Sequence, residues 1–273
     1  MTIASPKARR ATKPAPAHPR AAPVRNSPFR PGPPRDRSNH DQIVRTLGEE
    51  ILAGVHAPGE NLPPEPDLLR RFGVSRTVLR EVLKTLGAKG MVIAKARVGT
   101  RVLDAQHWNF FDRDVVSWKV AHGADKDFRR SVAEIRRALE PAAARLAALH
   151  RSPAEIEAMR AEIAAMRAAT TALGYAEADL RLHLIIGAAS GNPLMRSLAA
   201  VIEAALMEAF TMSPPVRRPR LQQQTTDGHE AIVDAIAMRN GPAAAQAMVA
   251  VIDAGFTRIE RERAAGKRRK TPS

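Results

Sequence analysis

The chain has 273 residues, a formal net charge of +15 and 44% hydrophobic residues. This length predicts two domains rather than one, and the hydrophobic fraction is sufficient for buried cores. The absence of cysteine excludes a disulfide framework and a thiolate metal site. No apolar run approaches about 20 residues, so we expect no membrane-spanning helix. The positive charge indicates a polyanionic partner or basic tails.

Residues 1–37 are predicted to form a disordered basic arm. They contain nine prolines and nine Lys or Arg residues, opposed only by Asp36. Such a segment cannot bury enough apolar surface to offset the entropy lost on ordering. A second basic tail is expected over residues 265–273. Two interpretations of these tails stay open: weak attraction to phosphates, and solvated charge that aids solubility.

Residues 38–104 are predicted to form a winged helix-turn-helix domain. Apolar residues first recur at a spacing near 3.6, which indicates an amphipathic helix. After a short second helix and a glycine-containing turn, Ser75 is a favourable N-cap for a third helix. Two short apolar segments joined by a basic turn then predict the strands of a wing. The expected elements are helices at 41–54, 65–72 and 75–90 and strands at 91–94 and 100–103.

One face of the third helix is predicted to read DNA. Arg76, Arg80 and Lys84 follow one another at i, i+4 spacing, with Thr77 beside them and an apolar row opposite. Such a face offers forked donors to guanine edges and to phosphates, and Arg97 in the wing can reach a minor groove or a phosphate. The alternative is a merely solvated basic surface, but the coincidence of cap, turn and wing favours DNA. The expected DNA-binding residues are Ser75, Arg76, Thr77, Arg80, Lys84, Arg97, Gly99 and Thr100.

The rest of the chain is predicted to be helical, because no strand pattern appears after residue 103. We expect a linker helix within 105–122 and an all-α antiparallel helical bundle over 123–264. The predicted fold class is therefore mainly α, with a winged helix-turn-helix followed by a helical ligand-binding domain. The helices expected after the linker are 132–149, one that begins at Ser152, 175–189, 193–212, 222–238 and 242–263.

Two sets of motifs resemble known regulators. The head is similar to the GntR superfamily of bacterial transcription regulators, and the resemblance extends over roughly residues 40–260. Its motifs are Gly59-x-x-Leu62-Pro63-x-Glu65, Phe72-Gly73-Val74-Ser75-Arg76-x-x-x-Arg80-Glu81 and Gly99-Thr100-x-Val102. The helical half resembles the FadR-like branch, whose C-terminal FCD domain binds a small carboxylate. Its motifs are Glu134-x-Arg136-x-x-Leu139-Glu140-Pro141, Asp179-x-x-x-His183, Ser190-Gly191-Asn192-Pro193 and Gly228-His229-Glu230-x-Ile232-x-x-Ala235-Ile236. The resemblance implies a cytoplasmic bacterial homodimer that binds a pseudo-palindromic operator on the nucleoid.

Asp179, His183 and His229 form a candidate metal or effector site. The first two lie at i, i+4 on one helix, so both can chelate one ion, and His229 comes from another helix. A divalent first-row metal such as zinc, nickel or manganese suits this set. The alternative is a pair of ordinary histidines bonded within the bundle. The resemblance to the FadR-like branch implies a further ligand, because members that hold a metal usually supply a histidine where this chain has Val251. Either the three residues and the ligand's oxygens hold the ion weakly, or the pocket works without metal and the histidines donate hydrogen bonds.

Two further residues are expected in the effector site. The planar fork of Arg136 suits bidentate capture of a carboxylate. Its alternative role is a structural ion pair with a buried acid such as Glu140. Asn192 is expected to point into the cavity, unless its Asn-Pro turn serves only to end a helix.

The linker resembles that of repressors of galactonate catabolism, through Gln106-x-Trp108-Asn109-x-x-Asp112-x-Asp114-Val115-x-x-Trp118. The resemblance implies a sugar-acid effector that releases a repressor from its operator, with Trp108 and Trp118 between the domains. Two other functions are possible in principle. A metal-dependent enzyme using the Asp179, His183 and His229 cluster lacks a positioned nucleophile or base, so we expect no enzyme. A non-specific DNA-packaging protein would bind through its basic tails.

Overall fold

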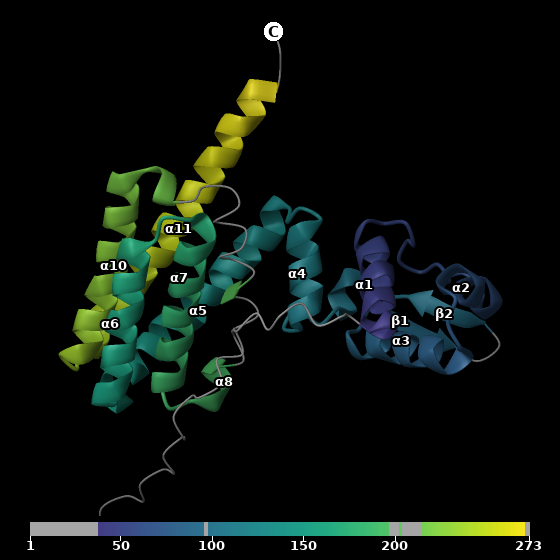
Figure 1. Cartoon of the computed structure of the whole chain (residues 1–273), viewed down its shortest axis with the longest axis horizontal. Helices are drawn as coiled ribbons and strands as arrows, with labels where there is room; N and C mark the ends of the chain where they lie inside the picture. Colours follow the sequence, from purple (N-terminus) through teal and green to yellow (C-terminus); the bar gives the residue numbers. More distant parts are fainter. Residues whose placement is uncertain (1–37, 96–97, 197–201, 204–214, 271–273) are drawn as a thin grey trace, which may run out of the picture. The chain divides into compact units, whose positions relative to one another are not determined.

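The computed structural model describes residues 38–95, 98–196, 202–203 and 215–270. The arm expected over 1–37, the wing residue Arg97 and most of the helix expected over 193–212 lie outside this part. The described chain is mainly helical with a small sheet, which confirms the predicted fold class (Figure 1). None of its helices is both long and apolar enough to cross a membrane. The elements are α1 (Asn39–Leu52), α2 (Glu65–Phe72), α3 (Arg76–Ala88), β1 (Val92–Lys95), β2 (Gly99–Val102), η1 (Ala105–His107), α4 (Arg113–Ala121), α5 (Lys126–His150), α6 (Pro153–Ala168), α7 (Ala172–Ala189), α8 (Pro193–Arg196), η2 (Pro215–Arg217), α10 (Pro219–Ala237) and α11 (Gly241–Lys270).

The turn between α2 and α3 depends on one glycine and one serine. Gly73 follows α2 with a φ of +63°, a conformation that glycine adopts without steric cost, and its N–H donates to the carbonyl of Leu69. Ser75 then caps α3, because its hydroxyl accepts a hydrogen bond of 3.3 Å from the backbone N–H of Val78. The two residues end one helix and begin the next, as the sequence predicts for a helix-turn-helix.

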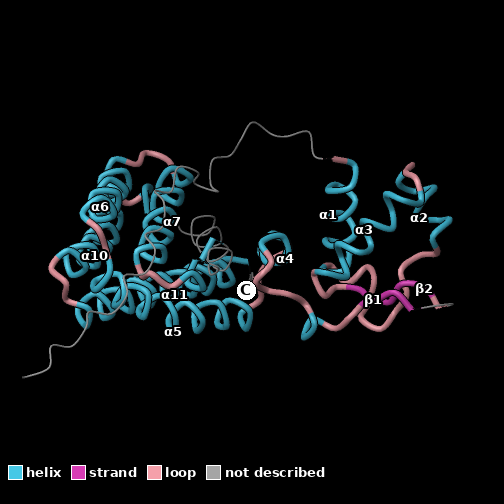
Figure 2. Tube along the Cα trace, turned by 90° about the horizontal axis from the view of Figure 1, so that it is seen from below, coloured by secondary structure: helices cyan, strands magenta, loops and turns pink. Residues whose placement is uncertain are grey.

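The wing is an antiparallel hairpin of β1 and β2 (magenta in Figure 2). Val92 lies opposite Val102 at its base, and Lys95 lies opposite Gly99 at its tip. The two valines are buried in the core of the head, whereas Lys95 and Gly99 are exposed. The hairpin is therefore anchored at its base and presents its tip to solvent.

Helix α4 packs against α1 and adds to the core of the head. Trp118, which was expected between the domains, is 6% exposed and lies in this core. The packing requires Gly48 of α1, since a Cβ atom there would lie 2.3 Å from a carbon of the Trp118 ring. The buried residues of the head core are Ile43, Val44, Leu47, Ile51, Leu62, Leu68, Leu79, Val82, Leu86, Met91, Val92, Val102, Val115 and Trp118.

A buried lysine also joins α3 to α4. The side chain of Lys89 is 8% exposed, and its Nζ donates to both carboxylate oxygens of Asp112 at 2.8 and 2.9 Å and to Asp114 at 2.7 Å. Asp112 in turn caps α4 by accepting hydrogen bonds from its first backbone N–H groups. The ion pairs thus fix the start of α4 to the end of α3.

The helical half is a bundle in which α5 packs against α7, α10 and α11, and α6 packs against α7 and α10 (Figures 1 and 2). The predicted start of α6 at Ser152 is confirmed by a capping box, in which Ser152 and Glu155 exchange hydrogen bonds with each other's backbone. The last helix, expected over 242–263, continues to Lys270, because no strong helix breaker precedes Pro272.

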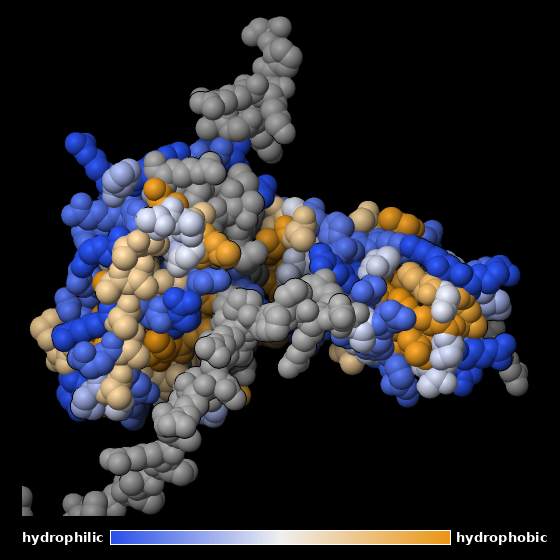
Figure 3. Space-filling view, in the orientation of Figure 1, coloured by the Kyte–Doolittle hydropathy of each residue, from blue (hydrophilic) through white to orange (hydrophobic). Residues whose placement is uncertain are grey.

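The surface carries both charged and apolar side chains. Figure 3 shows hydrophilic residues over much of the face in view and a patch of apolar residues on the head, at the right. The exposed large apolar side chains of the described chain are Val55, Ile93, Val98, Phe111, Ile135, Leu149, Leu173, Leu194 and Met238.

Candidate functional site

The outward face of α3 is cationic, and its inward face is part of the head core. Arg76 Nε lies 3.6 Å from the carboxylate of Glu65, and Lys84 Nζ donates to Glu81 at 2.7 Å. Both pairs are exposed and therefore weak, so a phosphate can replace the carboxylate. The exposed side chains of α3 include Arg76, Thr77, Arg80, Glu81 and Lys84, and its buried ones are Leu79, Val82 and Leu86.

The remaining predicted DNA-binding residues take different places. Ser75 uses its hydroxyl to cap α3, so its contribution is to position the helix. Gly99 begins β2 at the exposed tip of the wing with a φ of +111°, and Thr100 follows it. Arg97 falls in the gap of the described chain. The structure thus places Arg76, Thr77, Arg80 and Lys84 on one helix, with the wing as a separate projection.

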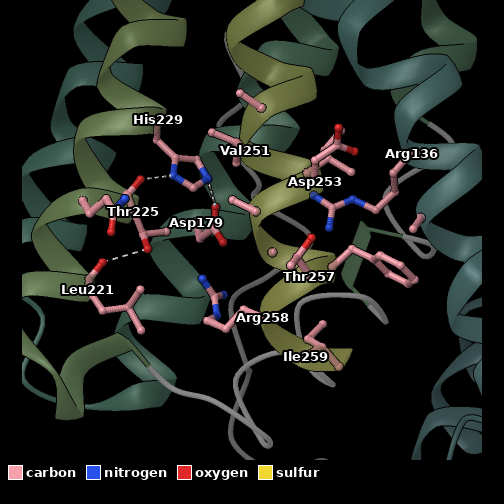
Figure 4. A pocket seen from close by; sticks show the side chains of 18 of the residues that line it. Arg136, Asp179, Leu221, Thr225, His229, Val251, Asp253, Thr257, Arg258 and Ile259 are labelled. Atoms are coloured by element: carbon pink, nitrogen blue, oxygen red, sulfur yellow. Dashed lines mark hydrogen bonds and ion pairs between the residues drawn. The ribbon is translucent and has the colours of Figure 1, made fainter. Parts of the chain in front are cut away.

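The helical half contains a cavity of about 710 Å³ lined by residues of α5, α7, α10 and α11 (Figure 4). This volume suits a small-molecule ligand. Three predicted site residues, Asp179, His183 and His229, lie on its wall and are almost completely buried. Arg136 lines the cavity as well. The structure therefore brings together four of the five residues that the sequence assigned to an effector site.

The buried charged residues of this wall form a continuous chain. Arg136 Nε donates to Glu140 at 2.5 Å, and the other carboxylate oxygen of Glu140 lies 2.5 Å from His183 Nδ1. Asp179 Oδ1 lies 3.4 Å from His183 Nε2 and 2.9 Å from His229 Nε2 (Figure 4). The two histidine side chains lie close to these carboxylates, but without the geometry of hydrogen bonds. Asp179, His183 and His229 therefore meet the cavity as a network of buried ion pairs.

Burial and charge act in opposite directions on this chain of residues. Burial alone would raise the pKa of Glu140, but Arg136 and His183 overcome this effect and hold the pKa at about 2. Burial would likewise raise the pKa of Asp179, but His229 and His183 hold it well below its usual range. Burial would lower the pKa of His183, whereas the two carboxylates raise it to about 9. Both carboxyl groups are consequently ionised.

The donor set fits a divalent metal ion. One ligand atom from each of Asp179, His183 and His229 lies within 4.8 Å of the other two. The ring Nδ1 of His229 lies 2.7 Å from the carbonyl of Thr225, which can only accept, so Nδ1 carries a proton and Nε2 is the nitrogen that would bind an ion. Val251 lines the same cavity and offers no ligand atom. The described residues therefore supply three ligands.

Arg136 and Asn192 both make contacts that the sequence offered as alternatives to a ligand-binding role. Arg136 Nε donates to Glu140, the acid expected as its structural partner, and the Arg136 side chain also lines the cavity. Asn192 is not among the residues that line the cavity. Its side-chain oxygen accepts a hydrogen bond of 3.0 Å from the backbone N–H of Leu194, at the start of α8.

Arg258 on α11 is among the residues of the cavity that sequence reasoning did not name. It lies seven residues after Val251, two helical turns along the same face. Its Nε is buried and has no hydrogen-bond partner among the described residues. The spacing from Val251 was the signal that could have found it.

Comparison with known proteins identifies both halves of the chain. The family model for bacterial regulatory proteins of the gntR family matches residues 39–102, and the model for the FCD domain matches residues 131–254. The galactonate operon transcriptional repressor of Escherichia coli (strain K12) is 33% identical over 226 residues, which cover 81% of this chain and 96% of that protein. The chain belongs to the GntR family.

A further relative supports this assignment, and a solved structure shares the fold. The uncharacterized HTH-type transcriptional regulator YieP of Escherichia coli (strain K12) is 35% identical over 223 residues, 77% of this chain and 90% of that protein. A solved structure of Lar, which controls expression of the Listeria monocytogenes agr system, shares the fold, with a TM-score of 0.58 and 21% identity over 81% of this chain and 96% of that chain. This GntR protein is a DNA-binding transcription regulator with an FCD domain, and its domains and relatives exclude the enzyme considered as an alternative.

Proposed function

We propose that this GntR regulator is a homodimeric repressor of sugar-acid catabolism that acts in the cytoplasm. Its two heads would bind the half-sites of a pseudo-palindromic operator, and a small hydroxylated carboxylate in the cavity would release them. The observation that carries the proposal is the combination of the cationic face of α3 with a cavity whose wall includes the buried Asp179, His183 and His229. The name of the galactonate operon repressor at 33% identity supports the ligand class.

The proposed readout assigns direct base contacts to Arg76 and Thr77 in the first turn of α3. Arg80 and Lys84, one and two turns further on, would bind phosphates or guanine edges. In the wing, Gly99 would allow the backbone to approach the DNA closely. Arg97 would reach the groove or a phosphate, as its position in the sequence suggests.

The proposed release works by population shift. A ligand that binds better to the state with an unsuitable spacing of the heads draws the dimer away from the operator. A coupling of about 1–3 kcal/mol between the two sites is enough for a useful response. A divalent ion held by Asp179, His183 and His229 would supply further positive charge for an anionic ligand, with the ligand's oxygens completing its coordination.

The DNA readout is tested with the full chain and duplexes selected from a random pool. We expect the protein to enrich a pseudo-palindrome. Arg76→Ala should reduce discrimination against random DNA by about 1–3 kcal/mol, roughly fivefold to 150-fold, since forked hydrogen bonds to a base are removed. Arg160→Ala, an exposed arginine on α6, is the matched control and should change nothing. Fluorescence anisotropy measures both affinities. Unchanged discrimination by Arg76→Ala would remove this residue from the readout.

The ligand response is tested on the selected operator with a panel of aldonic acids, each with and without a chelator. At least one acid should weaken operator binding, and sedimentation should show a dimer. A regulator indifferent to every acid of the panel would contradict the proposed effector class. The chelator distinguishes a site that binds the ligand through a metal ion from one that binds it without metal. Only the metal-assisted response disappears when the ion is removed.

A further inference from the structure

The cavity of the FCD domain is rich in arginine, and most of these side chains already have partners. Arg129 and Arg218 pair with Glu260 and Glu262 at 2.9 and 2.7 Å. Arg136 pairs with Glu140, as described above, and Arg261 is exposed to solvent. The arginines that line the cavity are Arg129, Arg136, Arg218, Arg258 and Arg261.

Arg258 differs from the others in being partly buried without an acid that pairs with it among the described residues. Its Nε is shielded from water and has no hydrogen-bond partner there. Burial lowers the pKa of this guanidinium, although the nearby Tyr175 and Asp179 oppose the effect. A buried cation without an acceptor is unfavourable, so an anion that supplies oxygen acceptors would bind with a favourable electrostatic contribution.

The position of Arg258 relates it to the donor cluster of the cavity. Figure 4 shows Arg258 and Asp179 as side chains of the same pocket, which come from α11 and α7. Asp179 Oδ1 and His229 Nε2 lie 2.9 Å apart on the wall of this cavity and present an acceptor and a ring nitrogen to it. The cavity thus combines a cation suited to a carboxylate with polar atoms suited to hydroxyl groups.

We propose that Arg258 binds the carboxylate of a hydroxylated monocarboxylic acid, and that Asp179 and His229 bind its hydroxyl groups. The proposal rests on the proposed function, since it names the anchor within that effector site. It assigns this role to Arg258 in place of Arg136. Arg136 already donates from Nε to Glu140, a carboxylate that is 3% exposed and would be poorly compensated if a ligand drew Arg136 away. Binding at Arg258 breaks no ion pair of the described chain.

The experiment measures binding of sodium D-galactonate, sodium gluconate and sodium L-lactate to the full chain by calorimetry. Galactitol serves as a polyol without a carboxylate. We expect wild-type protein to bind at least one of the acids and not galactitol. Arg258→Gln should weaken that binding by about tenfold to a hundredfold, the range for removal of a charged hydrogen-bonded pair. Arg258→Lys keeps the charge without the fork and should recover part of the affinity.

Two further variants and two further measurements make the result specific. Arg160→Gln, an exposed arginine of α6 that does not line the cavity, is the matched control and should bind like wild type. Arg136→Gln should lower the thermal unfolding temperature, because Glu140 loses its partner. Arg258→Gln should keep both the wild-type unfolding temperature and operator affinity, which shows that it is folded.

The outcomes separate this inference from the function on which it rests. If an acid binds wild type and Arg258→Gln equally well, the assignment of Arg258 is overturned while the effector site stands. If no acid binds wild type, the sugar-acid function and the role of Arg258 both fall. If galactitol binds as tightly as the acid, the carboxylate contributes nothing and the assignment is again wrong.

Discussion

His229 shows how a single hydrogen bond prepares a side chain for binding. The carbonyl of Thr225 accepts from Nδ1, which leaves Nε2 directed at Asp179. His183 has a comparable arrangement, with Glu140 beside Nδ1 and Asp179 beside Nε2. Partners on the far side of a histidine ring are the ones that orient metal-binding imidazoles in general. The site therefore has its orienting partners in place, while the wall on α11 contributes Val251.

Replacement of Val251 by histidine should show whether the number of protein ligands limits the affinity of the site for a metal ion. We expect Val251→His to bind zinc at least about tenfold more tightly than wild type, equivalent to about 1.4 kcal/mol, because it adds a fourth protein ligand. Zinc titration by calorimetry measures the change. Ala247→His, which is placed one turn earlier on α11 at another lining position, is the control. Equal zinc affinity of wild type and Val251→His would show that position 251 does not face the ion.

The sequence predicted the cluster of Asp179, His183 and His229 because helical spacing and family motifs both place these residues together. It could not predict which arginine of the cavity is free to bind a ligand. Whether Arg136 or Arg258 is free depends on which acids lie beside them after the helices pack, and this information is absent from local spacing. Glu140 was named as a possible partner of Arg136 because both lie on one helix, four residues apart.

Secondary structure was easier to predict than the contacts between side chains of different helices, since its signals are local. The capping of α3 by Ser75 and of α6 by Ser152 follows from residues within one helical turn. The packing of α4 on α1 was not predicted, because the apolar residues of α4 suit a helix between domains as well as one within the head. Only the tertiary packing of Trp118 on Gly48 distinguishes the two arrangements.

The tie between α1 and α2 should make the stability of the head depend on pH. Glu50 forms an ion pair with Arg71 and lies 3.2 Å from His56, and hydrogen bonding to Arg71 is the main cause of its lowered pKa. A carboxyl group with a lowered pKa stabilises the fold above its unfolded value of 4.5, and this contribution is lost as pH falls through the lower folded value.

We therefore expect Glu50→Gln to lower the free energy of unfolding by about 1 kcal/mol at pH 7, a modest figure because Arg71 is partly exposed and screened by solvent. The difference from wild type should shrink towards zero as the pH is brought well below 4.5. Denaturant titrations at the two pH values measure it. Glu81→Gln, which removes an exposed i, i+3 pair, should show little effect at either pH. A difference that persists in acid would rule out the ionised carboxylate as its cause.

At the scale of the whole chain, the basic arm and the cationic helix should make separable contributions to DNA binding. Residues 1–37 carry nine Lys and Arg, which can add sequence-independent attraction to phosphates. The face of α3 is placed by a packed head and can discriminate between bases. Affinity and specificity are therefore expected to respond differently when the arm is removed.

Deletion of residues 1–37 should lower affinity for operator and random duplexes alike and leave their ratio unchanged. The dependence of log affinity on log salt should become shallower by about 0.9 for each phosphate that the arm no longer neutralises. Anisotropy titrations over a range of salt concentrations measure both quantities. Arg76→Ala in the full chain serves as the comparison, because it should instead change the ratio of operator to random affinity. Collapse of the ratio on deletion would instead favour the DNA-packaging function considered from the sequence.

The close packing of Gly48 and Trp118 has a practical consequence for anyone who wants the DNA-binding half in isolation. The family match ends at residue 102, but a fragment cut there would remove the indole and leave a groove on α1 exposed to water. Exposed apolar surface of this kind promotes self-association. A fragment that extends through residue 121 retains all of α4 and is the better choice for titrations or crystallisation with a duplex.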